Sequence, residues 1–156
     1  MPPKRSVPTV DAKPTNPKDL IGSDKIPLHL WPETATVLGS LALLDGALKY
    51  GRANWREAGV RASIYVDAVK RHLNAWFEGE DFDNSEHGSG LPHLAHALAC
   101  LAIIVDADAA GKLTDDRNYP GGYDALVTDL TPMVAAIKAK YAERKSPKQY
   151  TIADAE

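Results

Sequence analysis

The chain has 156 residues, a formal net charge of −3 and one cysteine, Cys100. This length suits a single well-buried domain, and the slight acidity argues against a broad basic surface for nucleic acid. No segment supplies the roughly 20 apolar residues of a membrane span. A basic N-terminus without an apolar stretch predicts no signal peptide, and a lone cysteine favours a reducing cytoplasm.

The two ends of the chain differ in pattern from its middle. Residues 1–19 are rich in Pro, Lys and Thr without a hydrophobic period, which predicts a flexible arm. Asn16 to Leu28 indicates an extended, turn-rich lead-in. Residues 20–145 are predicted to form one helical domain, and residues 146–156 a loose tail.

The first long helix is predicted to begin near Pro32 and to end at Tyr50, before Gly51. Apolar residues recur at three- and four-residue steps, which predicts a buried stripe. Asp45 lies one turn from two stripe positions, so its carboxylate should border the buried face. The stripe comprises Val37, Leu38, Leu41, Leu44 and Leu48.

Three further helices follow, and no convincing strand pattern separates them. They are predicted at about 60–77, from Pro92 to Gly111, and at about 123–144, where Pro132 is expected to kink or split the helix. Short loops between long helices favour antiparallel neighbours. The predicted class is therefore all-α, an antiparallel helical bundle.

Hairpin geometry brings separated polar residues to common levels. If the first two long helices fold back around Arg56, Asp45 and Asp67 are equally far from the turn. If the next pair folds back around Ser85, His72 lies level with His96, and His93 lies one turn nearer the loop.

These residue types predict a site for a metal ion and a nucleoside triphosphate. Carboxylates suit Mg²⁺ or Mn²⁺, cations neutralise phosphate oxygens, an aromatic face with an amide suits a base, and an imidazole can orient or deprotonate a water. The candidate metal ligands are Asp45, Asp67, Glu80, Asp81, Asp83 and His93. The candidate phosphate ligands are Lys49, Arg56, Arg61 and Arg71, the base ligands Asn54 and Trp55, and the catalytic residues His72 and Asp45.

Structural alternatives stand beside each assignment. Asp45–Lys49 and Asp67–Arg71 have the spacing of ordinary intrahelical ion pairs. Lone helical histidines are more often packed core residues, and tryptophans often fill cores. His93, His96 and Cys100 share one helix face and suggest zinc, but zinc sites normally take three or four nitrogen or sulfur ligands and no second cysteine exists.

Several short motifs, in one order, resemble the phage dATP/dGTP diphosphohydrolase family, a group of short MazG-like proteins. Their MazZ-like branch consists of (d)GTP diphosphohydrolases from phages that replace adenine with 2-aminoadenine. The resemblance covers residues 16–118. The motifs are Asn16-Pro-Lys-Asp, Gly46-Ala-Leu-Lys-Tyr-Gly, Asn54-Trp-Arg, Gly59-Val-Arg-Ala-Ser, Arg71-His72, Gly79-Glu-Asp-Phe-Asp and His93.

This resemblance implies an all-α nucleoside triphosphate pyrophosphohydrolase that depends on Mg²⁺ or Mn²⁺. It also implies a homo-oligomer, a dimer or tetramer, with sites near subunit contacts. The reaction would release pyrophosphate from a purine deoxynucleoside triphosphate, and dGMP would feed synthesis of the 2-aminoadenine nucleotide. The superfamily's Glu-Glu-x-x-Glu helix pattern is absent, and Glu78-Gly-Glu-Asp81 matches its Glu-x-x-Asp half by spacing alone.

Two alternatives remain from the sequence. One is a non-catalytic helical phage protein that binds a replication partner through these polar residues. The other keeps catalysis but changes the reaction to triphosphohydrolase or phosphatase chemistry, although the chain has no adjacent His-Asp dyad.

Overall fold

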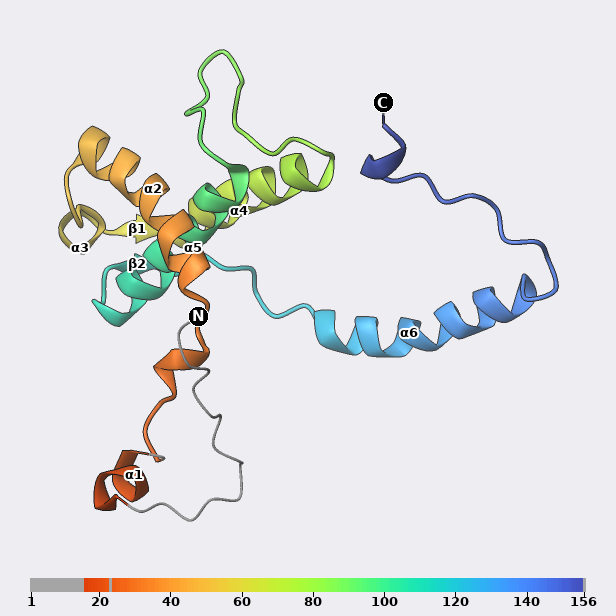
Figure 1. The fold of residues 1–156 in the computed structure, drawn as a ribbon, viewed down its shortest axis with the longest axis horizontal. Coiled ribbons are helices and arrows are strands. Elements are labelled where there is room, and N and C mark those ends of the chain that lie inside the picture. The colour runs from red at the N-terminus through yellow and green to blue at the C-terminus, as the bar shows by residue number, and fades with distance from the viewer. Residues whose placement is uncertain (1–15, 23, 156) are drawn as a thin grey trace, which may run out of the picture. The chain divides into compact units, whose positions relative to one another are not determined.

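A computed structural model of the chain describes residues 16–22 and 24–155. The chain divides into two compact units, Met1–Thr34 and Ala35–Glu156. The first contains helix α1 (Pro17–Gly22) and the 3-10 turn η1 (Leu28–Leu30) (Figure 1). The lead-in predicted to be extended is thus partly helical, because the Asn16 side chain accepts the Lys18 N–H at 2.9 Å and Pro17 suits a first helical position. The arm predicted for residues 1–19 falls largely outside the described residues.

The long helices of the second unit follow the prediction closely. They are α2 (Glu33–Tyr50), which begins at the end of the first unit, α4 (Ala62–Phe77), α5 (His93–Ala109) and α6 (Tyr123–Lys140). The all-α class is confirmed. α6 is continuous through Pro132 rather than split, and it ends before the predicted residue 144. Within the tail predicted to be loose, Ile152–Asp154 forms a 3-10 turn, η2.

Three short elements that the sequence did not predict lie between these helices. Helix α3 (Trp55–Ala58) and strand β1 (Val60–Arg61) connect α2 to α4, and strand β2 (Leu113–Thr114) follows α5. β1 and β2 pair in parallel, with Val60 opposite Leu113. Gly59 precedes β1 with φ +76°, and a Cβ there would lie 2.9 Å from the carbonyl oxygen of Lys112. A residue without a side chain is therefore required for this approach.

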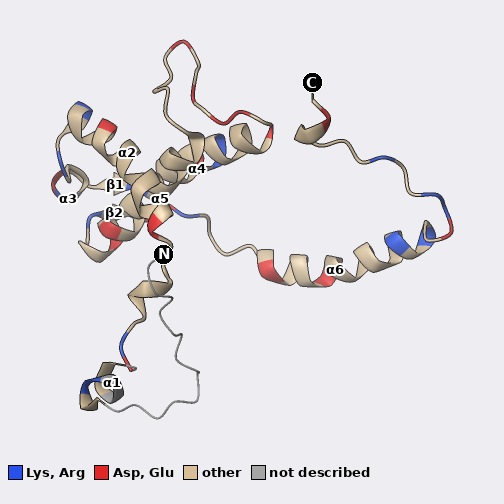
Figure 2. Cartoon of the chain, viewed as in Figure 1, with Lys and Arg blue, Asp and Glu red and all other residues tan. Residues whose placement is uncertain are grey.

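α4 and α5 pack side by side as an antiparallel hairpin (Figure 1). Their connection, residues 78–92, carries a concentration of acidic residues (Figure 2). The loop folds back on itself through a bridge between Phe82 and Pro92, and the Asp83 N–H donates to the Leu91 carbonyl at 2.9 Å. This closure returns the acidic loop to the first turn of α5.

α2 contacts α5 through small residues. Ala42 is buried against Ala95 and Ala99, and a Cβ on Gly39 would lie 3.4 Å from the Cβ of Leu98. Small side chains allow two helix backbones to approach closely. Apart from Val69, the buried hydrophobic residues of the described chain are alanines.

Most of the apolar stripe predicted to be buried on the first helix lies instead on the surface of this single chain. Val37, Leu41, Leu44 and Leu48 are 45–80% exposed. Leu38, the fifth member of the stripe, does pack against the alanines that α2 and α5 bury between them. The period of the helix and the burial of Leu38 were therefore predicted correctly, but the burial of the other four residues was wrong.

Candidate functional site

Three histidines meet where α4 packs against the first turns of α5. His72 Nδ1 lies 2.9 Å from His93 Nδ1, and the His72 ring stacks on His96 with centroids 4.6 Å apart and planes at 17°. The predicted common level of His72 and His96 is confirmed. His93 is 5% exposed, so it is the buried member of the group.

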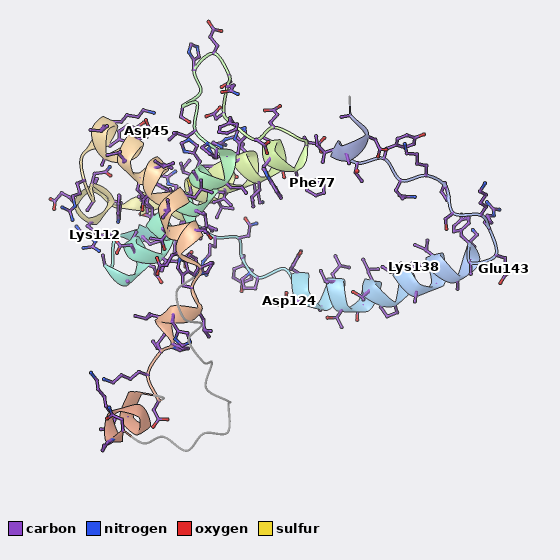
Figure 3. All side chains as sticks on the ribbon, in the orientation of Figure 1. Asp45, Phe77, Lys112, Asp124, Lys138 and Glu143 are labelled. Atoms are coloured by element: carbon purple, nitrogen blue, oxygen red, sulfur yellow. The ribbon has the colours of Figure 1, made fainter. Side chains whose placement is uncertain are left out.

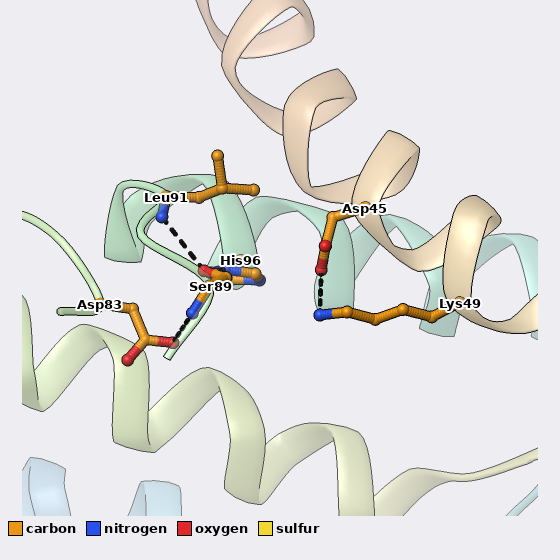
Figure 4. Close-up of polar contacts among 6 residues, drawn as sticks. All are labelled: Asp45, Lys49, Asp83, Ser89, Leu91 and His96. Atoms are coloured by element: carbon orange, nitrogen blue, oxygen red, sulfur yellow. Dashed lines mark hydrogen bonds and ion pairs between the residues drawn. The ribbon is translucent and has the colours of Figure 1, made fainter. Parts of the chain in front are cut away.

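The loop between α4 and α5 contacts His96 through Ser89. Asp83 accepts the Ser89 N–H at 3.2 Å and the Ser85 hydroxyl at 3.1 Å. The Ser89 oxygen accepts the Leu91 N–H at 3.1 Å and lies 2.6 Å from His96 Nε2 (Figure 4). The Ser89 hydroxyl can donate to His96 Nε2 or accept from it, according to the tautomer of the imidazole. The acidic loop is thereby tied to α5.

Electrostatics keep two of these imidazoles neutral. Burial lowers the pKa of His72, and the neighbouring His96 and His93 lower it further. Burial also lowers the pKa of His96, against the opposing effects of Asp83 and Asp45. Neutral imidazoles present one acceptor nitrogen and one N–H each, which suits proton positioning and metal binding.

An ion pair on α2 faces this group of histidines. Lys49 Nζ lies 2.7 Å from Asp45 Oδ2 (Figure 4), and this hydrogen bond is the main cause that raises the pKa of Lys49. Burial would raise the pKa of Asp83, but the hydrogen bonds from Ser89 and Ser85 lower it below its ordinary value. We call the whole assembly the polar cluster: Asp45, Lys49, His72, Glu80, Asp83, Ser89, His93 and His96.

The buried Nε2 of His93 makes no hydrogen bond among the described residues. Glu80 Oε2 lies 3.7 Å from it. An imidazole nitrogen beside a carboxylate suits Mn²⁺, whereas Mg²⁺ prefers the carboxylate oxygens alone. No group of three or more His, Cys, Asp or Glu side chains within the described residues is already arranged around a metal position. The residue types therefore fit a metal, and Glu80, which is largely exposed, has room to move toward it.

The predicted base site lies in a second assembly, which we call the Asp106 group: Trp55, Arg56 and Asp106. Arg56 donates two hydrogen bonds to the Asp106 carboxylate, and Trp55 Nε1 donates a third at 2.5 Å. Asn54 stands at the start of α3, beside Trp55. Arg56 and Trp55 together lower the pKa of Asp106 to about 2.

The other predicted residues are dispersed. Arg61 lies 3.8 Å from Asp116, whose carboxylate also accepts the backbone N–H and hydroxyl of Ser63. Asp67 and Arg71 are exposed on α4, and among the described contacts no ion pair joins them to each other or joins Asp67 to Asp45. Asp81 contributes its carbonyl, which accepts the His93 N–H at 3.0 Å.

Sequence reasoning missed Ser89, Asp106 and Asp116 as members of these assemblies. It placed His96 level with His72 and on one helix face with His93, but it did not name His96 as a candidate site residue. The two aspartates pair with residues about 50 positions earlier, and no local pattern signals such contacts.

The fold and the polar cluster define an all-α protein with histidines and carboxylates gathered between helices. Residues 15–117 match the family model described as dATP/dGTP diphosphohydrolase, N-terminal. The chain belongs to this family.

A curated relative, the dATP/dGTP diphosphohydrolase of Salmonella phage PMBT28, is 36% identical over 95 residues. The match covers 61% of this chain and 31% of the relative, so the chain spans about a third of that protein's length. No solved structure matches the chain. In the part of the chain that the structure describes, none of the helices combines the length and apolar character needed to cross a membrane.

Proposed function

We propose that this chain hydrolyses dGTP, with GTP and dATP as further candidate substrates, to the monophosphate and pyrophosphate in a reaction that depends on Mg²⁺ or Mn²⁺. The observation that carries this proposal is the family match over residues 15–117, because that segment contains the entire polar cluster. The name of the Salmonella phage relative supports the reaction class.

Glu80 and His93 are the first candidates to hold the metal, with Asp83 and Asp45 as further carboxylates. The unpartnered Nε2 of His93 beside Glu80 supports this assignment. Asp67 and Asp81 remain outer candidates from the sequence. Such an ion, when bound, makes a water more acidic and offsets negative charge on phosphate oxygens.

The contact between two histidines orients the reacting groups. A histidine that binds metal through one nitrogen usually donates the N–H of the other to a fixed partner. Here His93 Nδ1 would donate to His72 Nδ1 at 2.9 Å, which leaves the His72 proton on Nε2. His72 then orients the water or a phosphate oxygen. Water attacks the α-phosphorus, the bond to the bridging oxygen breaks, and pyrophosphate leaves.

The four candidate phosphate ligands fall into two pairs, one in or near the polar cluster and one paired with aspartates outside it. Lys49, beside the carboxylates of the polar cluster, and Arg71, which lies near enough to His72 to lower its pKa, are the candidates for the triphosphate. Arg56 and Arg61 must first leave Asp106 and Asp116 to reach a phosphate. Asn54 and Trp55 are the base candidates.

We place the reaction in the host cytoplasm of a phage that uses 2-aminoadenine. There, hydrolysis of dGTP lowers a competing nucleotide and supplies dGMP as a precursor. The sequence resemblance supports this setting, and so does the single cysteine, Cys100, which suits a reducing compartment. We further expect a homo-oligomer that binds neither nucleic acid nor membrane.

The test incubates the full chain with dGTP, GTP, dATP and dCTP, with Mg²⁺, Mn²⁺ or a chelator, and separates the products. We expect dGMP and pyrophosphate with metal and none with chelator. Asp129→Asn on α6 is the control for charge removal away from the polar cluster. Formation of dGDP would show phosphatase chemistry instead, and release of inorganic triphosphate would show triphosphohydrolase chemistry. No turnover of any purine nucleotide would favour the non-catalytic binding protein.

A further inference from the structure

Helix α6 lies beyond residues 15–117 of the family match and supplies none of the residues of the polar cluster or the Asp106 group. Every residue of α6 is exposed, although the helix is rich in large apolar side chains. Leu130, Val134 and Ile137 are 48%, 50% and 58% exposed. A contiguous apolar face of this kind marks an interaction surface.

Six apolar residues of α6 follow a heptad spacing, and Leu126 and Met133 widen the apolar face on one flank. The spacing alternates between four and three residues without interruption from the first residue of the helix to the residue that ends it. Such a 3.5-residue repeat is the seam of a two-helix coiled coil. The seam comprises Tyr123, Val127, Leu130, Val134, Ile137 and Tyr141.

The face of α6 opposite the seam contains Pro132, which is compatible with coiled-coil pairing. Pro132 lies on the outer face, 180° from the seam at 100° per residue, so its ring does not obstruct a partner. Ala135 and Ala139 lie on the same outer face. Helices bend at proline, and those that wrap a partner are convex toward solvent, which is the side where Pro132 lies.

The charged residues of α6 indicate which helix packs on the seam and in which direction that helix runs. Asp124 at the start of the helix and Lys138 near its end lie on the same flank of the seam, 14 residues or about 21 Å apart. Figures 2 and 3 show the acidic residues toward the start of α6 and the basic residues toward its end. In two parallel copies this flank would face the opposite flank of the partner, whereas in two antiparallel copies the same flanks face each other and Asp124 lies beside Lys138 at both ends.

We propose that α6 pairs antiparallel with α6 of a second copy of this chain. In this register Leu130 packs against Val134 of the second copy, and Val127 packs against Ile137. Asp124 and Lys138 flank the seam at each end. Antiparallel helices also align their dipoles favourably.

Sedimentation equilibrium of the full chain over a range of micromolar concentrations tests this proposal. Leu130→Glu places a charge in the seam, and Ala136→Glu places the same charge on the outer face. We expect Leu130→Glu to shift the association midpoint to at least ~10-fold higher concentration, because a buried unpaired charge is costly, while Ala136→Glu leaves it unchanged. Circular dichroism verifies that both variants are folded.

A charge-swap series distinguishes this pairing from packing of α6 on its own chain. Asp124→Lys and Lys138→Asp should each weaken association at low salt, and the double variant should restore it. The two positions are too far apart on one helix for this rescue to arise within a chain. A monomer at all concentrations, equal effects of Leu130→Glu and Ala136→Glu, or a double variant as weak as the single variants would each overturn the proposal. None of these readouts depends on nucleotide hydrolysis.

Discussion

Arg56 on α3 and Asp106 on α5 form a two-point ion pair, with Nε 2.7 Å from Oδ2 and Nη2 2.6 Å from Oδ1. The pairing is fork to fork, a geometry that gives direction as well as attraction. It joins residues 50 positions apart, so it fixes the connection after α2 to the side of α5. A triphosphate that engages Arg56 must therefore compete with Asp106.

Asp106→Asn tests the structural part of this pairing through its pH dependence. The pKa of Asp106 lies at about 2 in the folded protein, below its ordinary 3.8, because Arg56 and Trp55 hydrogen-bond to the charged form. A carboxylate whose pKa is lower in the folded state stabilises the fold fully at pH values above its pKa in the unfolded state. This contribution to the free energy of unfolding is lost as the pH falls through the pKa of the folded state. The stability deficit of Asp106→Asn should thus be full at pH 7 and shrink as pH falls from about 4 toward 2.

Urea denaturation of both proteins at several pH values measures this deficit. Asp115→Asn is the matched control, because the pKa of Asp115 is also about 2 but its partner, Arg117, is only two residues away. Its loss should affect global stability less. A deficit of Asp106→Asn that stays constant from pH 7 to pH 2.5 would show that the ion pair is not its source.

Trp55 carries two possible roles that substitution separates. As a base-stacking residue it should contribute affinity, and Trp55→Ala should weaken nucleotide binding by roughly 5- to 150-fold while kcat at saturation survives. Trp55→Phe retains an aromatic face but removes the N–H that bonds to Asp106. Stacking predicts that Phe keeps most of the affinity. Equal losses of affinity in the Ala and Phe variants, measured by calorimetry, would instead assign Trp55 to holding Asp106.

The helices of this fold were predictable because apolar residues recur at helical steps and Gly51, Pro92 and Gly111 punctuate them. β1 and β2 were not, since two-residue strands have no period. They exist because the Val60 N–H donates to the Lys112 carbonyl at 3.0 Å, a tertiary contact. Most of the buried face was also mispredicted. Alanines such as Ala95 and Ala99 form the contact, and hydrophobicity alone ranks them below the leucines that stay exposed.

Site prediction succeeded where one hairpin sets the geometry. His72 lies 13 residues before Ser85, the middle of the α4–α5 loop, and His96 lies 11 residues after it. Counting residues therefore places them at roughly the same level, and their rings do stack. The same counting applied to Asp45 and Asp67 assumed that α2 and α4 form a hairpin. Instead, α3 and β1 intervene and α2 packs on α5, so no described contact joins the two carboxylates.

Asp45→Asn tests whether the carboxylate on α2 takes part in the reaction. If Asp45 helps to hold a metal, activity should fall at least ~100-fold, because several kcal/mol of charge stabilisation accompany the ion. The melting temperature should change little, since the pair with Lys49 is partly exposed. Lys49→Met removes the other partner of the pair, so a merely structural pair predicts the same small change of melting temperature in both variants and no loss of activity in either. Near-wild-type rates for Asp45→Asn would mean that the pair is structural.

Gly88→Ala tests whether the shape of the acidic loop matters to the polar cluster. A Cβ at residue 88 would overlap the carbonyl oxygen of Asp83 and lie 2.6 Å from its Oδ1. That carbonyl accepts the Gly90 N–H at 2.8 Å, and the Asp83 carboxylate accepts the Ser89 N–H. The added methyl must displace one of these groups, and Ser89 would move away from His96 with it. We expect a stability loss of about 1–3 kcal/mol, typical of overpacking, and a clear fall in activity measured well below the melting temperature.

Gly46→Ala is the control, since a Cβ there meets nothing within 4 Å and alanine favours a helix interior by roughly 0.5–1 kcal/mol. If Gly88→Ala loses stability but turns over dGTP as fast as Gly46→Ala does, the loop anchors the fold without shaping the site, and Asp83 and Ser89 leave the list of functional residues.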